Sequence, residues 1–107
     1  MSAVIDRVLA ALNGRDIEAL VAYYDPIATI EDGNDRVLAH GHAEIRDRYG
    51  PMCETYPALH VKLLRRWRVG SFVVQEERVT GSAMESEHHI VVYELDNELI
   101  VRERLLR

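Results

Sequence analysis

The spacing of apolar residues changes near Leu59, and this change limits the folds that the chain can adopt. Before Leu59, apolar residues recur at the helical period, and after it they alternate as in β-strands. Helices are predicted over 4–12, 16–24 and 42–56, short strands over 28–32 and 37–40, and a meander of strands over 60–69, 72–80, 88–95 and 99–106. This order is typical of an α+β fold, with three helices packed on one face of a curved, mostly antiparallel sheet.

Local signals mark the ends of the predicted helices. Asn13-Gly14 stops the first helix, and Asp16 is a candidate N-cap for the second. Asp25-Pro26 ends the second helix, because the residue before a proline disfavours helical geometry. The Gly50-Pro51 pair predicts a kink or break in the third helix.

Size, charge and cysteine content narrow the function. The 107 residues are enough for one domain, and a net charge of −5 argues against a nucleic-acid partner. The single cysteine, Cys53, excludes an internal disulfide and fits a reducing cytoplasm. Its place on the apolar side of a helix indicates packing. Asp6 and Arg7 interrupt the first apolar stretch, so we expect neither a signal peptide nor a membrane span there.

The strand predicted over 28–32 ends on two carboxylates, Glu31 and Asp32, with Asp35 close behind. One interpretation is a polar strand end followed by an Asx-type turn. The other is that Asp32 is half buried, which would raise its pKa and make it a general base. The carboxylates lack the spacing of a calcium loop, so no metal site is predicted here.

Two histidine pairs, His40 with His42 and His88 with His89, lack the spacing of a metal motif. Adjacent strand residues point to opposite faces, so His88 and His89 cannot share a ligand directly. A single inward histidine acting as acid, base or hydrogen-bond donor is the favoured interpretation.

Side chains alternate between the two faces of a sheet, and this alternation assigns the cationic residues of the strands over 60–69 and 99–106 to one face or the other. It places Trp67 with Val61, Leu63 and Val69 on one face, and Arg66 and Arg68 with Lys62 on the other. This pattern favours a half-buried strand over a nucleic-acid stacking surface. Arg102 and Arg104 share one face of the last strand, and on the concave face they would need anionic partners.

The first half of the chain resembles the nuclear transport factor 2-like superfamily. The resemblance is carried by the run from Gly14 to Leu20, Tyr24, the strand from Ala28 to Asp32, His40-Gly41 and Ile45. The sequence pattern is most similar to that of bacterial ketosteroid isomerases and SnoaL-like polyketide cyclases. The strands over 59–81 resemble a SnoaL-like branch of the superfamily. The resemblance covers nearly the whole chain, 1–107. It implies one domain with a cone-shaped α+β barrel and a pocket.

The resemblance assigns roles to individual residues. Asp32 matches the general base of the ketosteroid isomerases, and Tyr24 and Tyr49 match tyrosines that support the oxyanion hole. The essential oxyanion tyrosine falls at Val8, and its protonated aspartate partner falls at His89. The loss of both donors argues against steroid isomerisation, since each donor contributes roughly 3–4 kcal/mol. His89 is a candidate replacement donor.

The same mapping implies an apolar pocket with a few polar groups, as in most small-molecule sites. Its expected lining is Val8, Leu12, Tyr24, Asp32, Tyr49, Trp67, His89, Val91, Tyr93, Arg102, Arg104 and Leu106. The opposite face, with Ile90 and Val92, commonly pairs two subunits in this superfamily, so a homodimer is implied.

Two functions therefore remain open. The first is a cofactor-independent acid–base enzyme of the isomerase or polyketide-cyclase type, acting on a small apolar or weakly anionic molecule. Asp32 would be its base, and His89 or Tyr49 its donor. The second is a non-catalytic ligand-binding or dimerisation domain in which Asp32 pairs with Arg102 or Arg104. Two such cations would lower the pKa of Asp32 and make it a poor base.

Overall fold

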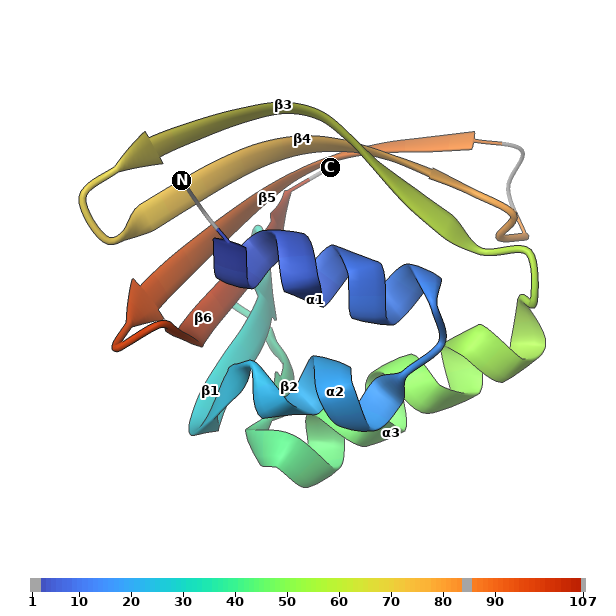
Figure 1. The fold of residues 1–107 in the computed structure, drawn as a ribbon, viewed down its shortest axis with the longest axis horizontal. Helices are drawn as coiled ribbons and strands as arrows, with labels where there is room; N and C mark the ends of the chain where they lie inside the picture. Colours follow the sequence, from blue (N-terminus) through green and yellow to red (C-terminus); the bar gives the residue numbers. More distant parts are fainter. Residues whose placement is uncertain (1–2, 84–85, 107) are drawn as a thin grey trace.

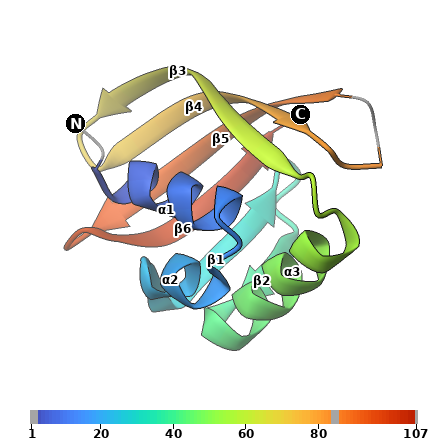
Figure 2. The same ribbon diagram turned by 45° about the vertical axis from the view of Figure 1, so that its right-hand side comes forward.

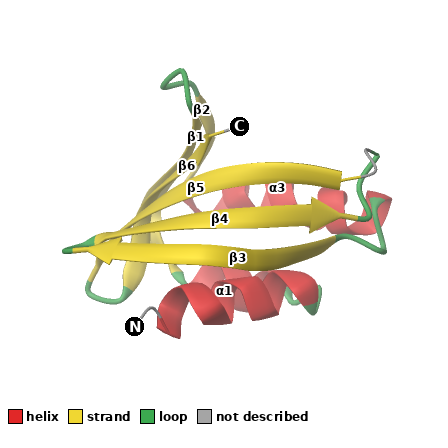
Figure 3. Ribbon diagram, turned by 90° about the horizontal axis from the view of Figure 1, so that it is seen from above, coloured by secondary structure: helices red, strands yellow, loops and turns green. Residues whose placement is uncertain are grey.

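The protein consists of three helices packed against the concave face of one curved sheet (Figures 1 and 3). The computed structural model describes residues 3–83 and 86–106. The helices are α1 (Ala3–Asn13), α2 (Ile17–Ala22) and α3 (Gly41–Thr55). The strands are β1 (Tyr24–Asp32), β2 (Val37–His40), β3 (His60–Val69), β4 (Phe72–Thr80), β5 (Ser86–Asp96) and β6 (Leu99–Leu106). The predicted α+β class is confirmed.

The strands are ordered β2-β1-β6-β5-β4-β3 in the sheet. Neighbouring strands run antiparallel except β1 and β6, which lie side by side in parallel although they are far apart in sequence (Figure 2). The sheet is unclosed, with β2 and β3 at its two edges. The barrel implied by the resemblance is therefore an open, curved sheet whose concave side is covered by helices.

The helix signals are borne out by the structure, with two differences. Asp16 caps α2, because its Oδ1 accepts the Ala19 backbone N–H at 3.1 Å. α2 ends at Ala22, and Tyr24, Asp25 and Pro26 belong to β1, so Asp25-Pro26 does not end the second helix as predicted. Pro51 lies inside α3, which continues through it to Thr55, so the helix does not break at Gly50-Pro51. Cys53 is buried in the core as predicted. Among the described residues no helix has the length and apolar composition needed to cross a membrane.

A β-bulge in β3 changes which side chains face the helices. Leu63 pairs with Glu77 and Arg65 with Glu76, so Leu64 is an extra residue without a partner. One extra residue moves every later side chain to the opposite face. Trp67 consequently lies on the outer face, 49% exposed, instead of joining Val61 and Leu63 on the inner face.

A second bulge has the same effect in β6. Leu95 pairs with Ile100 and Glu94 with Arg102, which leaves Val101 without a partner. Without this extra residue, Arg102 would stand opposite the buried Tyr93. The bulge instead places Glu103 opposite Tyr93, so the concave face receives a carboxylate where arginines were expected.

Candidate functional site

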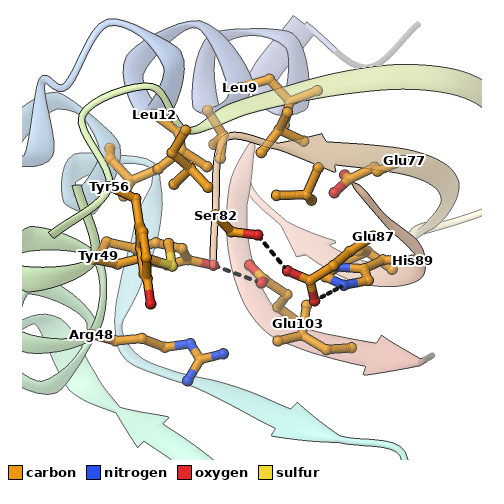
Figure 4. A pocket seen from close by; sticks show the side chains of 18 of the residues that line it. Leu9, Leu12, Arg48, Tyr49, Tyr56, Glu77, Ser82, Glu87, His89 and Glu103 are labelled. Carbon is orange, nitrogen blue, oxygen red and sulfur yellow. Dashed lines mark hydrogen bonds and ion pairs between the residues drawn. The ribbon is translucent and has the colours of Figure 1, made fainter. Parts of the chain in front are cut away.

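A cavity of about 220 Å³ lies between the helices and the concave face of the sheet (Figure 4). Much of its lining is apolar and includes Val8, Leu9, Leu12, Leu20, Val91 and Leu105. The charged, histidine and serine side chains that reach it are Arg48, Glu77, Ser82, Glu87, His89 and Glu103. An apolar chamber with a few polar groups has the composition expected of a small-molecule site.

Glu103 is the most deeply buried carboxyl group of this cavity, with 1% of the residue exposed. Its Oε1 accepts the Tyr24 hydroxyl, and its Oε2 accepts the Tyr49 hydroxyl at 2.9 Å. Burial raises the pKa of Glu103 above its usual value, although both tyrosine hydrogen bonds oppose the shift. Burial also raises the pKa of both tyrosines, so their hydroxyls keep their protons and remain donors.

Glu77 is the second buried carboxyl group, and a chain of polar contacts holds it from α1. Arg66 Nη2 lies 2.7 Å from Asp6 Oδ1, and Arg66 Nε donates to Gln75 Oε1 at 2.6 Å. Gln75 Nε2 then donates to Glu77 Oε2 at 2.7 Å. Burial raises the pKa of Glu77 to about 7, and hydrogen bonds from Gln75 and Tyr93 limit the shift. This carboxyl group therefore changes charge near neutral pH.

His89 lies beside Glu77, because the two residues are partners in the pairing of β4 with β5. Its side chain is 13% exposed, and Nε2 is 3.3 Å from Glu87 Oε1. Ser82 Oγ donates to Glu87 Oε2 at 2.9 Å, so Glu87 connects the serine to the histidine (Figure 4). His89 is thus on the cavity wall, where the resemblance placed it.

Asp32 lies at the end of β1, in a turn outside this cavity. Its Oδ1 accepts the backbone N–H groups of Asn34 at 2.8 Å and Arg36 at 3.0 Å. These bonds lower the pKa of Asp32 below its usual value, although partial burial opposes them. Its side chain is 28% exposed and lines an adjoining groove of about 640 Å³, which shares Arg48 and Leu105 with the cavity.

The arginines of β6 pair with carboxylates other than Asp32. Arg102 donates two hydrogen bonds to Glu31, at 2.8 and 2.9 Å, and these lower the pKa of Glu31. Arg104 Nη2 lies 2.5 Å from Asp35 Oδ1. Asp32 forms its ion pair with Arg36, at 3.5 Å. The structure therefore places neither β6 arginine in the cavity.

The structure brings together some of the residues that the sequence singled out and separates others. Those lining the cavity are Val8, Leu12, Tyr24, Tyr49, His89, Val91 and Tyr93. Those outside it are Asp32, Trp67, Arg102, Arg104 and Leu106. His42, of the other histidine pair, uses Nε2–H to donate to the Tyr24 carbonyl at 2.7 Å.

Sequence analysis missed Glu77 and Glu103, although each stands in the more apolar phase of its strand. In β4, Glu77 alternates with Val73 and Val79, which are buried. In β6, Glu103 alternates with Leu99, Val101 and Leu105, while the other phase carries two arginines. A carboxylate on the strand face that otherwise carries apolar residues indicates a buried, functional group, because charged side chains are rarely buried outside functional sites and ion pairs.

No group of three or more histidine, cysteine, aspartate or glutamate side chains suited to a metal ion occurs within residues 3–83 and 86–106. The polar part of the cavity is instead a set of carboxyl, hydroxyl and imidazole groups that can exchange protons.

Comparisons with known proteins identify the family and agree with this fold. A family model described as SnoaL-like domain matches residues 5–103. No curated protein sequence matches the chain. An uncharacterized cystatin fold protein from Novosphingobium aromaticivorans is 21% identical, with a TM-score of 0.91 over 97% of this chain and 95% of that one.

Two further solved structures are similar at low identity, and such likenesses show the fold alone. A candidate polyketide cyclase from Sinorhizobium meliloti is 16% identical over 98% of this chain and 94% of that one, with a TM-score of 0.86. An LEH-like epoxide hydrolase from M. tuberculosis is 17% identical over 98% and 80%, with a TM-score of 0.78. Since the family model spans almost all of the sequence, the chain belongs to the SnoaL-like domain family.

Proposed function

We propose that this protein is a cofactor-independent acid–base enzyme that acts on a small, mainly apolar molecule, with Glu77 as its general base. The observation that carries the proposal is a carboxyl group with a pKa of about 7 on the wall of an apolar cavity. A base is most effective when its pKa lies near the working pH, because it is then both ionised and basic enough to take a proton.

The surroundings of Glu77 support this role. Gln75 holds one carboxylate oxygen, and the Arg66–Asp6 pair holds Gln75, so the base is oriented before a ligand enters. His89 stands next to Glu77 on the neighbouring strand and is the candidate donor to a developing oxyanion. Tyr49 already donates its hydroxyl to Glu103, so its role in the proposal is to position that carboxyl group.

Asp32 is the weaker candidate for the base. Its lowered pKa favours a carboxylate that holds its charge without accepting a proton at neutral pH, and it faces the groove instead of the cavity. The names of two similar structures, a candidate polyketide cyclase and an epoxide hydrolase, support proton-transfer chemistry by analogy of fold only.

The test uses the Kemp elimination of 5-nitrobenzisoxazole, a small aromatic C–H acid. A base removes its ring proton, the C–H electron pair forms a nitrile, and the N–O bond breaks to give a coloured phenolate. We expect the wild-type rate to rise with pH through about 7, as Glu77 ionises. Glu77→Gln should lower the rate about 100-fold or more, since Gln cannot accept the proton.

Two matched variants make the result specific. Glu76→Gln changes the neighbouring carboxylate on the outer face, where it pairs with Arg65, and should leave the rate unchanged. Asp32→Asn should also leave the rate unchanged, whereas a large loss in that variant would assign the base to Asp32. Equal rates for the wild type and Glu77→Gln would remove the catalytic proposal and favour a non-catalytic ligand-binding domain.

We also propose a cytoplasmic location, for which the support is the single, buried cysteine. Fractionation of the cells that naturally produce this protein would test the location. Recovery of the protein from another compartment would contradict it.

A further inference from the structure

Arg48 occupies the junction between the cavity and the adjoining groove. It lies on α3 next to Tyr49, and its side chain lines both spaces. In Figure 4 its guanidinium group points toward the interior of the cavity, on the side opposite Glu77. Among the described residues, Arg48 is the only lysine or arginine that lines the cavity. The other charged residues of the lining are the acidic Glu77, Glu87 and Glu103.

The guanidinium of Arg48 has an unused donor. Its Nε is buried, and no acceptor within the described part of the chain hydrogen-bonds to it. Arg46, two residues earlier on the same helix, shows the contrast: its Nε and Nη2 donate to both oxygens of Glu18, at 2.7 and 3.1 Å. A buried donor without an acceptor is unfavourable, so an oxygen atom supplied to Arg48 would be bound tightly.

Glu103 does not satisfy Arg48. The positive charge of Arg48 acts to lower the pKa of Glu103, but no hydrogen bond or ion pair joins the two side chains, and the described partners of the Glu103 carboxyl oxygens are the hydroxyls of Tyr24 and Tyr49. No ion pair between Arg48 and a described carboxylate is formed. Arg48 therefore has no acceptor for its Nε within the described residues and lies where the cavity meets the groove.

We infer that Arg48 binds the carboxylate of an apolar acid whose hydrocarbon part fills the cavity and reaches Glu77. This inference rests on the proposed function and adds the class of substrate. A guanidinium matches a carboxylate in charge and in the spacing of its donors. The carboxyl groups of Glu77 and Glu87 line the cavity with Arg48, and they favour the orientation that keeps the anionic end of the acid at Arg48.

This orientation also organises the proposed reaction. The carboxylate stays at the groove, where it keeps part of its hydration, and the apolar body lies among leucine and valine side chains. A carbon atom remote from the carboxylate then faces Glu77 and His89. Arg48 would thus select the ligand and fix which of its C–H bonds meets the base.

The test compares 2-naphthoate with 2-naphthalenemethanol, an anion and a neutral molecule of nearly the same shape. Calorimetric titration at pH 7.5 should show that the wild type binds 2-naphthoate at least about tenfold more tightly, as a charge-assisted hydrogen bond would give. Arg48→Met should remove this preference, and Arg48→Lys should keep part of it because the charge remains. Arg46→Met, the matched arginine on α3, should keep the full preference.

Several results would overturn the inference: equal affinity of the wild type for the two probes, binding of neither, or a loss in Arg46→Met as large as in Arg48→Met. Thermal unfolding of each variant verifies that it is folded, and Arg48→Gln serves if the methionine variant is not. The assay measures binding and involves no turnover, so its result does not depend on whether Glu77 acts as a base. Failure of Glu77 as a base and failure of Arg48 as an anion site are therefore distinguishable.

Discussion

Glu76 and Glu77 are neighbours in β4, yet their carboxyl groups have opposite properties. Glu76 faces outward, where Arg65 Nε lies 2.8 Å from its Oε1 and His88 Nε2 lies 2.8 Å from its Oε2. The hydrogen bond from Arg65 lowers the pKa of Glu76. Glu77 faces the cavity, and burial raises its pKa to about 7. The pleat of the strand, which turns adjacent side chains to opposite faces, thus separates a structural carboxylate from a candidate base.

The raised pKa of Glu77 predicts how stability depends on pH. Its proton is held more strongly in the folded chain, at a pKa of about 7, than in the unfolded chain, at 4.5. The contribution of this proton to stability is complete below pH 4.5 and is lost as pH rises to about 7. Glu77→Gln should remove this loss, which is about 3 kcal/mol for a group buried to this degree.

Urea unfolding at pH 5 and pH 8 measures this effect. The wild type should lose stability between the two values, and Glu77→Gln should show a flatter dependence. Glu76→Gln is the control: the lowered pKa of Glu76 places its own contribution below about pH 4.5, so the slope between pH 5 and 8 should not change. An identical slope in Glu77→Gln and the wild type would show that Glu77 is not held neutral by burial.

Within the strands, the extra residues of two bulges, Leu64 and Val101, limit how much of the site could be predicted from the sequence. The periodicity located β2, β3, β4 and β6 with their observed bounds, because repeated apolar spacing is a strong signal. The bulges at Leu64 and Val101 leave no such signal, because one extra residue is invisible in a short alternating pattern. Trp67 and Arg102, which follow these bulges, were expected on the concave face and lie on the outer one.

The turn after β4 imposes a different constraint on a single residue, Gly81. Its φ of +78° lies in the left-handed region, and a Cβ atom there would stand 2.1 Å from the Ala58 carbonyl oxygen. Gly81→Ala should lower the free energy of unfolding by about 2 kcal/mol or more. Gly50→Ala, in α3 with no neighbour within 4 Å of the new atom, should leave it unchanged or raise it by about 0.5–1 kcal/mol.

Chemical denaturation of both glycine variants measures these changes. If the Gly81→Ala protein is as stable as Gly50→Ala, the backbone of this turn can rearrange around the new Cβ atom without a loss of unfolding free energy. This result would also mean that the close approach of β4 to the segment before β3 is not needed to hold the cavity wall.

For the whole molecule, we propose a homodimer formed through the outer face of the sheet. Trp67, Val74 and Val92 are successive partners across β3, β4 and β5 and form an apolar row on that face. Trp67 is 49% exposed in the single chain, and covering a large apolar side chain of this kind favours association. The bulge at Leu64 turns Trp67 to this outer face.

Sedimentation velocity over a range of concentrations tests the dimer. The wild type should sediment as a dimer, Trp67→Asp should shift it to the monomer, and Trp67→Phe should retain the dimer because the apolar surface remains. A monomeric wild type, or a dimer that Trp67→Asp leaves intact, would exclude this face as the contact.

The parallel pairing of β1 with β6 has a consequence for the order in which the molecule forms. β6 joins the β1–β2 pair to the β3–β4–β5 meander, and it brings Glu103 to the hydroxyls of Tyr24 and Tyr49. Contacts between segments so distant in sequence close slowly, because a long loop must be ordered before they form. We expect the cavity to be completed in the same late step. Binding of a ligand during refolding would then measure the final docking of β6. Helices and hairpins that form earlier would not change the amount of bound ligand.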